Sequence, residues 1–252
     1  MARRVSKRKQ PDRDDFRVKE QWKIEEGVFD RKTMMNIEKV FTHGIVSRMI
    51  HIISKGKEAD VYLAEAGEKV NEAYVVLKIF NQENTSFKRR TEYVKGDPRF
   101  DGVRADVRSI IRIWCRKEYG NLKIAEEAQV SAPKPYYFKG NVLAMQLIGD
   151  DGVPSPILKD IEIENPERVL DEIIENMKRL YSANLVHGDI SEYNILIKDG
   201  MPFLIDIGQG VSLGHPKAGE FLERDVTNIL YYFKKTYRVE RNQEKVVSQI
   251  NS

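Results

Sequence analysis

The sequence has little of what builds disulfide frameworks or zinc sites. Cys115 is the only cysteine among 252 residues, which excludes an internal disulfide and any zinc site made of several cysteines. The four histidines are scattered and do not show the spacing of metal ligands. The fold must therefore be stabilised by a hydrophobic core.

Long apolar runs are also missing. No stretch approaches the roughly 18–20 apolar residues of a transmembrane helix. The basic start of the chain is not followed by the apolar segment of a secretory signal. Hydrophobic residues make up 41% of the chain and charged residues 32%, which is typical of a soluble globular protein. We therefore expect a cytoplasmic protein without a membrane partner.

Charge is abundant, and it is unevenly distributed. The formal net charge is +3, yet residues 1–10 hold five basic and no acidic side chains, and residues 88–117 hold ten basic and four acidic ones. The rest of the chain carries a net charge of −8. Two basic segments on an acidic body indicate contact with a polyanion such as nucleic acid. The alternative is that both segments are solvated surface.

The hydrophobic patterns predict two lobes. Residues 1–20 are expected to form a basic flexible tail, and residues 21–49 one or two short helices. Residues 50–148 contain β-type runs and form a first lobe, whereas residues 149–252 are mainly helical and form a second. A cleft between two lobes is the usual place for a ligand. The β-type runs are Ile50–Ile53, Val61–Ala64, Tyr74–Phe80, Tyr136–Lys139 and Val142–Ile148.

Periodicity is lost between residues 81 and 109, where the chain is polar, charged and broken by Gly96-Asp97-Pro98, so a long loop is predicted. Helical spacing returns over Ile110–Ala125. Asn165, followed by a proline and an acid, has the pattern of a helix N-cap, and a further helix is predicted over Glu220–Phe233. The apolar stripe of the helix after Asn165 consists of Val169, Leu170, Ile173, Ile174, Met177 and Leu180.

The second lobe contains a predicted hairpin that presents two polar ligands. Asp199-Gly200 is a strong signal for a two-residue β-turn. The register then pairs Ile195 with Leu204, so Asn194 and Asp206 meet at the open end of the hairpin. Two hard oxygen donors beside a cleft suit Mg²⁺, because phosphates and water supply its other ligands.

Asp189 lies five residues before Asn194, on the loop that enters the hairpin. From there its carboxylate could accept a proton from an attacking hydroxyl or water. Taken singly, Asp189 could stabilise a turn, and Asn194 and Asp206 could be polar strand ends. Together, the spacing is that of phosphoryl transfer in protein kinases, in which an aspartate accepts the proton while an asparagine and a second aspartate hold metal.

Such a site requires a lysine in the first lobe. Lys78 lies within an apolar strand run, where a cation is costly unless it is paired. It matches the kinase lysine that holds the α- and β-phosphates and pairs with a helix glutamate. Glu118 is the first choice of partner, with Glu126 and Glu127 as alternatives. The competing interpretation is an edge-strand lysine whose ammonium reaches solvent.

A phosphate-binding loop is expected between the first two strands. The segment around Ser54, Gly56 and Lys57 occupies that place. It has one glycine where a kinase glycine-rich loop has three, so the pattern is weak by itself. The Ser54 hydroxyl, the Lys57 ammonium and backbone N–H groups could still bind phosphate oxygens.

Three motifs together resemble the RIO family of atypical serine/threonine protein kinases. They are SKGKEADVY at residues 54–62, HGDISEYN at residues 187–194 and IDIGQ at residues 205–209. The second and third are most similar to the Rio-one subfamily, and the near absence of extensions resembles an archaeal member. The likeness runs from about Trp22 to about Tyr237.

The resemblance implies an α+β fold: a trimmed bilobal protein kinase with an antiparallel β N-lobe, a helical C-lobe and added N-terminal helices. It implies ATP with Mg²⁺ or Mn²⁺ in the cleft. In that scheme the catalytic aspartate is Asp189, the metal ligands are Asn194 and Asp206, and the ion pair is Lys78 with Glu118. The ATP-binding residues would include Ser54, Gly56 and Lys57, and at the hinge the carbonyl of Gln146 and the N–H of Ile148 would meet adenine.

The resemblance also implies a role for Asp206 as a nucleophile, because the metal-loop aspartate of RIO proteins can itself be phosphorylated during ATP hydrolysis. The family acts in maturation of the small ribosomal subunit. The expected partners are therefore a pre-ribosomal small-subunit particle and its rRNA, which the basic segments would fit. The protein substrate is not indicated.

The sequence departs from ordinary protein kinases in ways that argue against phosphorylation of a docked peptide. Gly188 replaces the arginine of the H-R-D motif, no A-P-E motif follows Asp206, and the 46 residues after Asp206 are too few for a full peptide-docking subdomain. Asp225 could brace the catalytic loop through its backbone. These features favour autophosphorylation or ATP hydrolysis as a conformational switch. Ser109, placed before a helix, is the preferred autophosphorylation candidate.

Two other functions remain open from the sequence. A small-molecule phosphotransferase of the aminoglycoside or choline type also uses His-Gly-Asp and a later metal aspartate, but builds its acceptor site from longer helical additions. An RNA-binding assembly scaffold with a nucleotide switch would keep the basic segments and lose catalysis. Lys78, Asp189, Asn194 and Asp206 are all present, which argues against a degenerate site.

Overall fold

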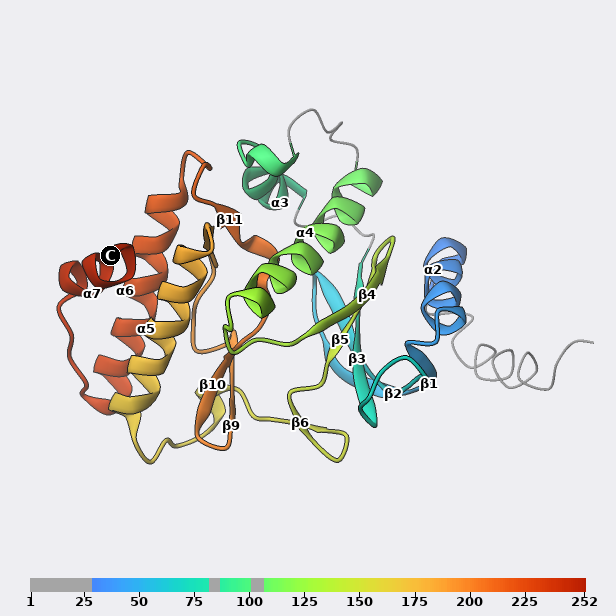
Figure 1. Ribbon diagram of the computed structural model, residues 1–252, viewed down its shortest axis with the longest axis horizontal. Helices are drawn as coiled ribbons and strands as arrows, with labels where there is room; N and C mark the ends of the chain where they lie inside the picture. The colour runs from blue at the N-terminus through green and yellow to red at the C-terminus, as the bar shows by residue number, and fades with distance from the viewer. Residues whose placement is uncertain (1–28, 82–86, 101–106) are drawn as a thin grey trace, which may run out of the picture.

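The computed structural model describes residues 29–81, 87–100 and 107–252. They form the two lobes shown in Figure 1, a β-rich N-lobe and a helical C-lobe. The predicted tail over residues 1–20 lies outside the described residues. The N-lobe sheet has the order β1-β2-β3-β5-β4, and its neighbouring strands are antiparallel. Its strands are β1 (Val46–Lys55), β2 (Ala59–Ala66), β3 (Tyr74–Phe80), β4 (Pro135–Lys139) and β5 (Val142–Gln146).

The N-lobe sheet is covered by a helix on each face. α2 (Arg31–Thr42) begins at Asp30, whose carboxylate accepts hydrogen bonds from the N–H groups of the first turn. Alternation along β3 places Leu77 in the core beneath α2. Phe80, on the opposite face of β3, joins the core that includes α4 (Val107–Glu127). Because Lys78 shares that face, it points towards α4.

The first strand and the helix before it differ from the predicted boundaries. The strand predicted over Ile50–Ile53 is the middle of β1, so the division at residue 49 cuts through a strand. β1 is an edge strand with mostly exposed side chains, so hydrophobicity does not mark its ends. One helix, α2, lies in the described part of residues 21–49.

The segment predicted as a loop, residues 81–109, contains a helix. α3 (Phe87–Val94) is followed by the short helix η1 (Pro98–Phe100). The helix is anchored by Tyr93 and Val94, which are buried. The Tyr93 ring stacks on Phe221 of the C-lobe, with 4.9 Å between centroids. A mainly charged helix with two apolar anchors has too weak a periodicity to be found from sequence.

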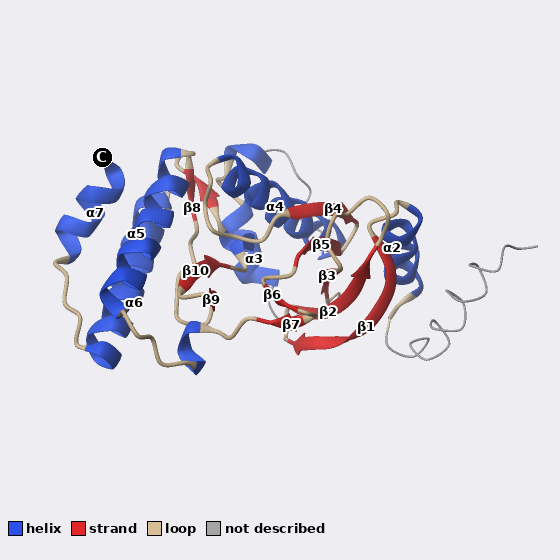
Figure 2. Ribbon diagram, turned by 60° about the horizontal axis from the view of Figure 1, so that its bottom comes forward, coloured by secondary structure: helices blue, strands red, loops and turns tan. Residues whose placement is uncertain are grey.

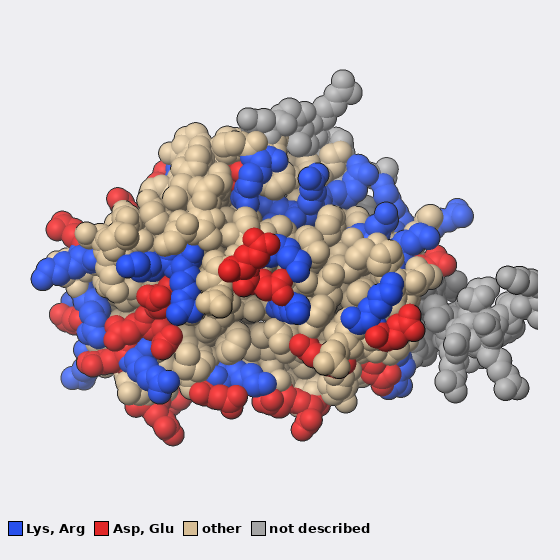
Figure 3. Space-filling model, in the orientation of Figure 1, with Lys and Arg blue, Asp and Glu red and all other residues tan. Residues whose placement is uncertain are grey.

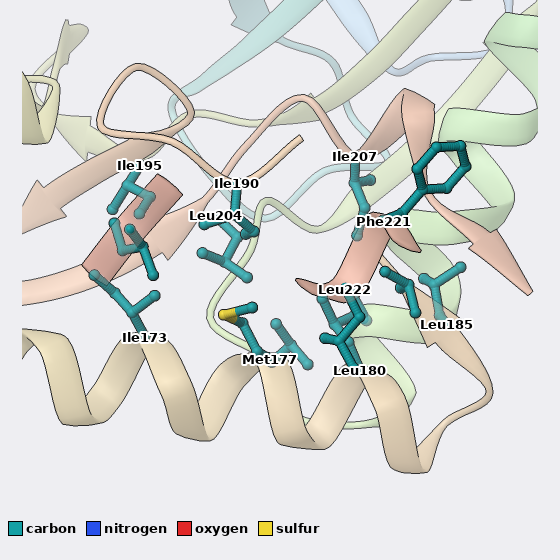
Figure 4. Close-up of a cluster of buried hydrophobic side chains, with 14 of the residues drawn as sticks. Ile173, Met177, Leu180, Leu185, Ile190, Ile195, Leu204, Ile207, Phe221 and Leu222 are labelled. Atoms are coloured by element: carbon teal, nitrogen blue, oxygen red, sulfur yellow. The ribbon is translucent and has the colours of Figure 1, made fainter. Parts of the chain in front are cut away.

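The C-lobe is built on α5 (Pro166–Ser182), whose N-cap is Asn165 as predicted: its side chain accepts the N–H of Arg168 at 3.1 Å. Figure 4 shows the buried stripe of α5 facing the catalytic-loop residue Ile190, together with Ile195 and Leu204 of the hairpin. The predicted hairpin register is confirmed, with Ile195 opposite Leu204. The strands and short helices of this lobe are β6 (Gly149–Asp150), β7 (Val153–Pro154), η2 (Leu158–Asp160), β8 (Leu185–Val186), β9 (Ile195–Lys198), β10 (Met201–Leu204), η3 (Ile207–Gln209) and β11 (Val211–Ser212).

Two helices complete the C-lobe. The helix predicted over Glu220–Phe233 is longer, α6 (Ala218–Tyr237), and α7 (Gln243–Asn251) follows it. Figure 2 shows α5, α6 and α7 packed together at the end of the molecule away from the sheet. None of the helices in the described part of the chain is long and apolar enough to cross a membrane.

Candidate active site

The site forms where three segments distant in sequence meet. Lys78 on β3 donates hydrogen bonds to both carboxylate oxygens of Glu118 on α4, at 2.7 and 2.9 Å. The same ammonium reaches Oδ1 of Asp206, in the loop after β10, at 2.7 Å. The contact predicted between Lys78 and Glu118 is therefore present. The third member of the cluster, Asp206, was not predicted to touch the lysine.

Burial sets the electrostatics of this cluster. The side chain of Glu118 is 1% exposed and that of Lys78 9%, whereas the side chain of Asp206 is 50% exposed. Burial alone would lower the pKa of Lys78, but the two carboxylates more than offset it, so the pKa is raised. Burial raises the pKa of Glu118 to about 7 against the pull of the lysine. Asp206 is therefore the member of the cluster that is most accessible to a ligand.

Asp189 is held by two amide groups. Asn194 Nδ2 donates to the Asp189 carbonyl at 2.8 Å and to its Oδ2 at 3.1 Å. Gln209 Nε2 donates to the same Oδ2 at 2.7 Å. These hydrogen bonds hold the Asp189 carboxylate in one orientation. Gln209 lies in the third motif, but its contact with Asp189 could not be derived from the spacing.

The backbone on both sides of Asp189 is fixed by one buried carboxylate. Asp225 on α6 accepts the N–H of Gly188 at 2.7 Å and that of Ile190 at 3.0 Å. Its side chain is fully buried. Arg224 donates to the Gly188 carbonyl and to the Tyr93 hydroxyl, which links the loop to α3. The bracing role expected for Asp225 is therefore present in the structure.

Asp206 is placed by strained backbone and by α4. Its φ of 58° lies in the left-handed region, which non-glycine residues adopt infrequently. Lys117 Nζ donates to the carbonyl of Gly208 at 2.9 Å and also to that of Gly210. Asn121 Nδ2 donates to the carbonyls of Ile207 and Gly210 at 2.8 and 2.9 Å. Sequence reasoning missed both α4 residues, because they bind backbone carbonyls and no motif marks such contacts.

The loop after Asp206 also needs a glycine and a second clamp. A Cβ on Gly208 would lie 2.9 Å from Trp114 Nε1 and 3.1 Å from a Glu118 oxygen, so a side chain there would push against the ion pair. Arg99, beyond α3, donates to the carbonyl of Gly210 at 3.2 Å and pairs with buried Asp97. The segment predicted as a loop is thus tied to the position of Asp206.

The predicted phosphate loop forms the turn between β1 and β2. Ser54 lies near the end of β1 and Lys57 lies in the turn, and both side chains are exposed. The N–H of Gly56 donates to the carbonyl of Ala59 at 3.1 Å, so this amide closes the turn. A Cβ on Gly56 would lie 2.9 Å from the same carbonyl oxygen, which explains the glycine. Contact of Ser54, Gly56 and Lys57 with phosphate remains a prediction.

The remaining predicted residues lie at two other places. Gln146 ends β5, where its N–H donates to the Lys134 carbonyl at 2.8 Å, and the carbonyl of buried Ile148 accepts the N–H of Ser155 at 2.9 Å. Their contact with adenine remains a prediction. Ser109 lies inside the first turn of α4 and not before it, because the helix begins at Val107, three residues earlier than predicted. Its hydroxyl accepts a hydrogen bond from Arg112 at 3.4 Å.

His187, at the start of the catalytic loop, is a buried neutral imidazole. Its Nε2 lies 3.1 Å from the carbonyl of Ile205, which can only accept, so Nε2 carries the proton. Nδ1 is buried and has no hydrogen-bond partner among the described residues. Burial lowers the pKa of His187 to about 4. Protonating Nδ1 would place a charge in the core.

This burial predicts a loss of stability in acid. The unfolded chain binds the His187 proton near pH 6.5, whereas the folded protein binds it near pH 4. The stability that depends on neutral His187 is therefore fully present above pH 6.5. It is lost as the pH falls towards 4, and the loss in the free energy of unfolding reaches up to roughly 3 kcal/mol. Urea unfolding measures this effect. The free energy of unfolding of the wild type should fall between pH 6.5 and 4 relative to that of His187→Gln, whose amide can still donate to the Ile205 carbonyl but does not titrate. His43→Gln, at an exposed histidine, should not change the profile, and parallel profiles for wild type and His187→Gln would contradict the prediction.

A two-lobed fold in which a β3 lysine pairs with a helix glutamate, facing an Asp-Asn loop and a second aspartate, is that of the protein-kinase class. A family model described as the RIO domain matches residues 60–246. The chain belongs to the RIO family. It is 40% identical over 238 residues to the RIO-type serine/threonine-protein kinase Rio1 of Haloferax volcanii, covering 93% of this chain and 81% of that protein.

Other relatives support the same assignment. The Rio1 protein of Thermoplasma acidophilum is 41% identical over 186 residues, covering 74% of this chain and 96% of its relative. Human RIO1 is 35% identical over 236 residues, but this chain spans 41% of its length. The resemblance to the Rio-one subfamily and to its archaeal members is therefore confirmed.

A solved structure agrees with the fold. The Rio2 kinase of Chaetomium thermophilum, in its ADP/Mg²⁺-phosphoaspartate complex, superposes with a TM-score of 0.67 at 22% identity, covering 87% of this chain and 66% of that one. The predicted trimmed bilobal kinase fold is thereby confirmed.

Proposed function

We propose that this protein is an ATP-dependent serine/threonine kinase and ATPase that autophosphorylates and acts in the cytoplasm on the maturing small ribosomal subunit. The observation that carries the enzymatic part is the contact of Lys78 with both Glu118 and Asp206. In protein kinases a lysine–glutamate ion pair of this kind orients the ATP phosphates, and an aspartate beside it holds Mg²⁺. The names of the Rio1 relatives as serine/threonine kinases support the same activity.

The donor set fits a magnesium ion. Within the described part of the chain, no group of three or more His, Cys, Asp or Glu side chains could hold a metal ion. Mg²⁺ bound with ATP needs few protein ligands, because phosphates and water complete its shell. Asn194 uses its amide nitrogen on Asp189, so its oxygen is the atom left for a cation, and Asp206 offers a half-exposed carboxylate. The ion would neutralise charge on the phosphates.

The proposed chemistry gives one role to each of the two aspartates. A carboxylate oxygen of Asp206 attacks the γ-phosphorus, the bond to the ADP oxygen breaks, and ADP leaves. Asp189 accepts a proton from the water that next cleaves the aspartyl phosphate, or from a hydroxyl that attacks phosphorus directly. The phosphoaspartate named for the Rio2 structure supports the first route. Gly188 in place of the H-R-D arginine supports autophosphorylation and switching over phosphorylation of docked peptides.

Mass spectrometry of the intact protein after incubation with ATP and Mg²⁺ tests this function. Free phosphate should accumulate, and acid-stable phosphate should be found on a serine or threonine, with Ser109 as the expected site. Hydroxylamine-sensitive phosphate should be found on Asp206. If the protein neither hydrolyses ATP nor gains phosphate, the enzymatic proposal fails. Phosphorylation of an aminoglycoside or an amino alcohol would instead favour the small-molecule phosphotransferase.

The ribosomal part of the proposal is supported by the family resemblance and by the basic residues between positions 88 and 117. The tagged full-length protein should sediment with immature small-subunit particles and crosslink to their rRNA. Sedimentation only with mature ribosomes, or only as free protein, would contradict this part without affecting the enzymatic one.

A further inference from the structure

The N-lobe has a groove on the side of α4 opposite the ion pair. It lies between α2, α4 and the turn that joins β4 to β5, and has a volume of about 580 Å³. Arg112 and Arg116 line it from α4, where a spacing of four residues places them on one face. Glu118 is two residues from Arg116, but its side chain is buried against Lys78. The groove is therefore separate from the candidate active site.

The groove is strongly cationic. Lys32 of α2, Lys139 at the end of β4 and the two arginines of α4 line it, and no Asp or Glu does. All four side chains are exposed. Within the described part of the chain, no carboxylate pairs with any of them. Four uncompensated charges around a concave surface repel one another and attract an anion.

A chain of side-chain hydrogen bonds holds the groove in shape. Asn36 of α2 donates to Asn141 at 2.9 Å, and Asn141 donates to the hydroxyl of Thr33 and to the Phe80 carbonyl, both at 2.9 Å. Gly140 has a φ of +62°, and a Cβ on it would lie 2.1 Å from Asn36 Nδ2. The helix and the strand turn are thus locked together, so the groove needs little ordering before a ligand binds.

Aromatic rings lie beside the charges. Tyr137 and Phe138 of β4 line the groove and are half-buried. The exposed ring of His43 stacks on Tyr137, with centroids 4.3 Å apart and planes inclined by 21°. Cationic grooves with adjoining ring surfaces are typical of sites for single-stranded nucleic acid, where phosphates meet the cations and bases stack on the rings.

The cationic surface is longer than the groove. Figure 3 shows Lys and Arg side chains gathered over the N-terminal part of α4 and the surface towards α2. Such a band suits an extended polyanion better than a single phosphate group. We propose that the groove between α2, α4 and the β4–β5 turn binds the backbone of single-stranded RNA. The site would serve the RNA contact of the proposed function, but RNA binding and ATP turnover are measured separately and can fail separately.

Fluorescence anisotropy with a labelled 12-nucleotide poly(U) RNA and the full-length protein tests this site. Arg112→Ala/Arg116→Ala should weaken binding at least about tenfold, and it should reduce the slope of log affinity against log salt by roughly 0.7 for each phosphate that is no longer neutralised. Lys139→Glu, on a different element, should weaken binding as well. The matched control is Lys234→Ala/Lys235→Ala, which removes two exposed cations from α6 and should leave affinity and slope unchanged.

Three results would overturn the proposal. The first is an unchanged affinity and salt slope in both groove variants, with thermal melting that matches the wild type. The second is tighter competition at the groove by a doubly phosphorylated acidic peptide than by the RNA, because that would make the occupant a protein segment. Equal reductions in affinity in the groove variants and in the α6 control would count against the site in the same way.

Discussion

Replacing Asp206 by Asn should lower kcat for ATP turnover by about 10³-fold or more. The amide cannot carry the charge that binds a cation, and it cannot attack phosphorus. Asn tolerates the left-handed backbone at this position, so the loop should keep its shape. Phosphate release under saturating ATP and Mg²⁺ measures the effect, and phosphate on the residue at position 206 should disappear from the mass spectrum.

The matched control is Asp199→Asn. Asp199 is exposed at the tip of the hairpin and has a φ of 52°. Its replacement by Asn is therefore the same chemical change on a similar backbone, away from the site. It should turn over ATP at the wild-type rate. The kcat of Asp189→Asn should lie between those of Asp206→Asn and Asp199→Asn, about 10²-fold below the wild type, because this variant loses the proton acceptor. Turnover of Asp206→Asn within a few-fold of wild type would refute the assignment.

Replacing Lys78 by Met should cost about 3–5 kcal/mol of stability as well as activity, because it leaves the carboxylate of Glu118 buried without a cation. The double variant Lys78→Met/Glu118→Met removes both charges and fills the space with apolar atoms. It should regain most of the missing stability, since a buried ion pair can often be exchanged for well-packed apolar groups. Its ATP turnover should stay as low as that of Lys78→Met.

Comparing the single and double variants separates the effect of the ion pair on stability from its effect on ATP turnover. Urea unfolding followed by the fluorescence of buried Trp114 gives the free energies of unfolding of the wild type, Lys78→Met, Glu118→Met and the double variant. A double variant no more stable than Lys78→Met would show that the single variant is unstable for another reason. A double variant that recovered turnover would show that the lysine does not act on ATP.

The parts of the site that could be predicted are those with strong local signals. Asp199-Gly200 specifies its turn by backbone conformation alone, and this sets the hairpin register. Asn165 caps a helix through its own side chain. Lys78 is conspicuous because a charge in an apolar strand needs a partner. Glu118, the first choice among three candidate acids, is the partner in the structure.

The parts that could not be predicted depend on tertiary contacts with backbone atoms. Lys117 appears in the sequence as one more charge in a basic segment, yet it is 1% exposed and binds the loop after Asp206. Burial lowers the pKa of Lys117. α3 was missed because its stability comes from Tyr93 packing on the C-lobe, which no local pattern contains. The groove likewise exists only once α2 packs beside α4.

The brace on the catalytic loop has a consequence for synthesis of the chain. Gly188 and Ile190 are made before Asp225, and 35 residues separate Ile190 from the carboxylate that fixes its amide. At roughly 5–20 residues per second, translation of that stretch takes about 2–7 seconds. In the later part of this time, after residue 206, the growing chain already holds Lys78, Asp189 and Asp206 but lacks the Asp225 carboxylate that fixes the loop around Asp189. ATP turnover should therefore begin only after α6 has been made and has packed.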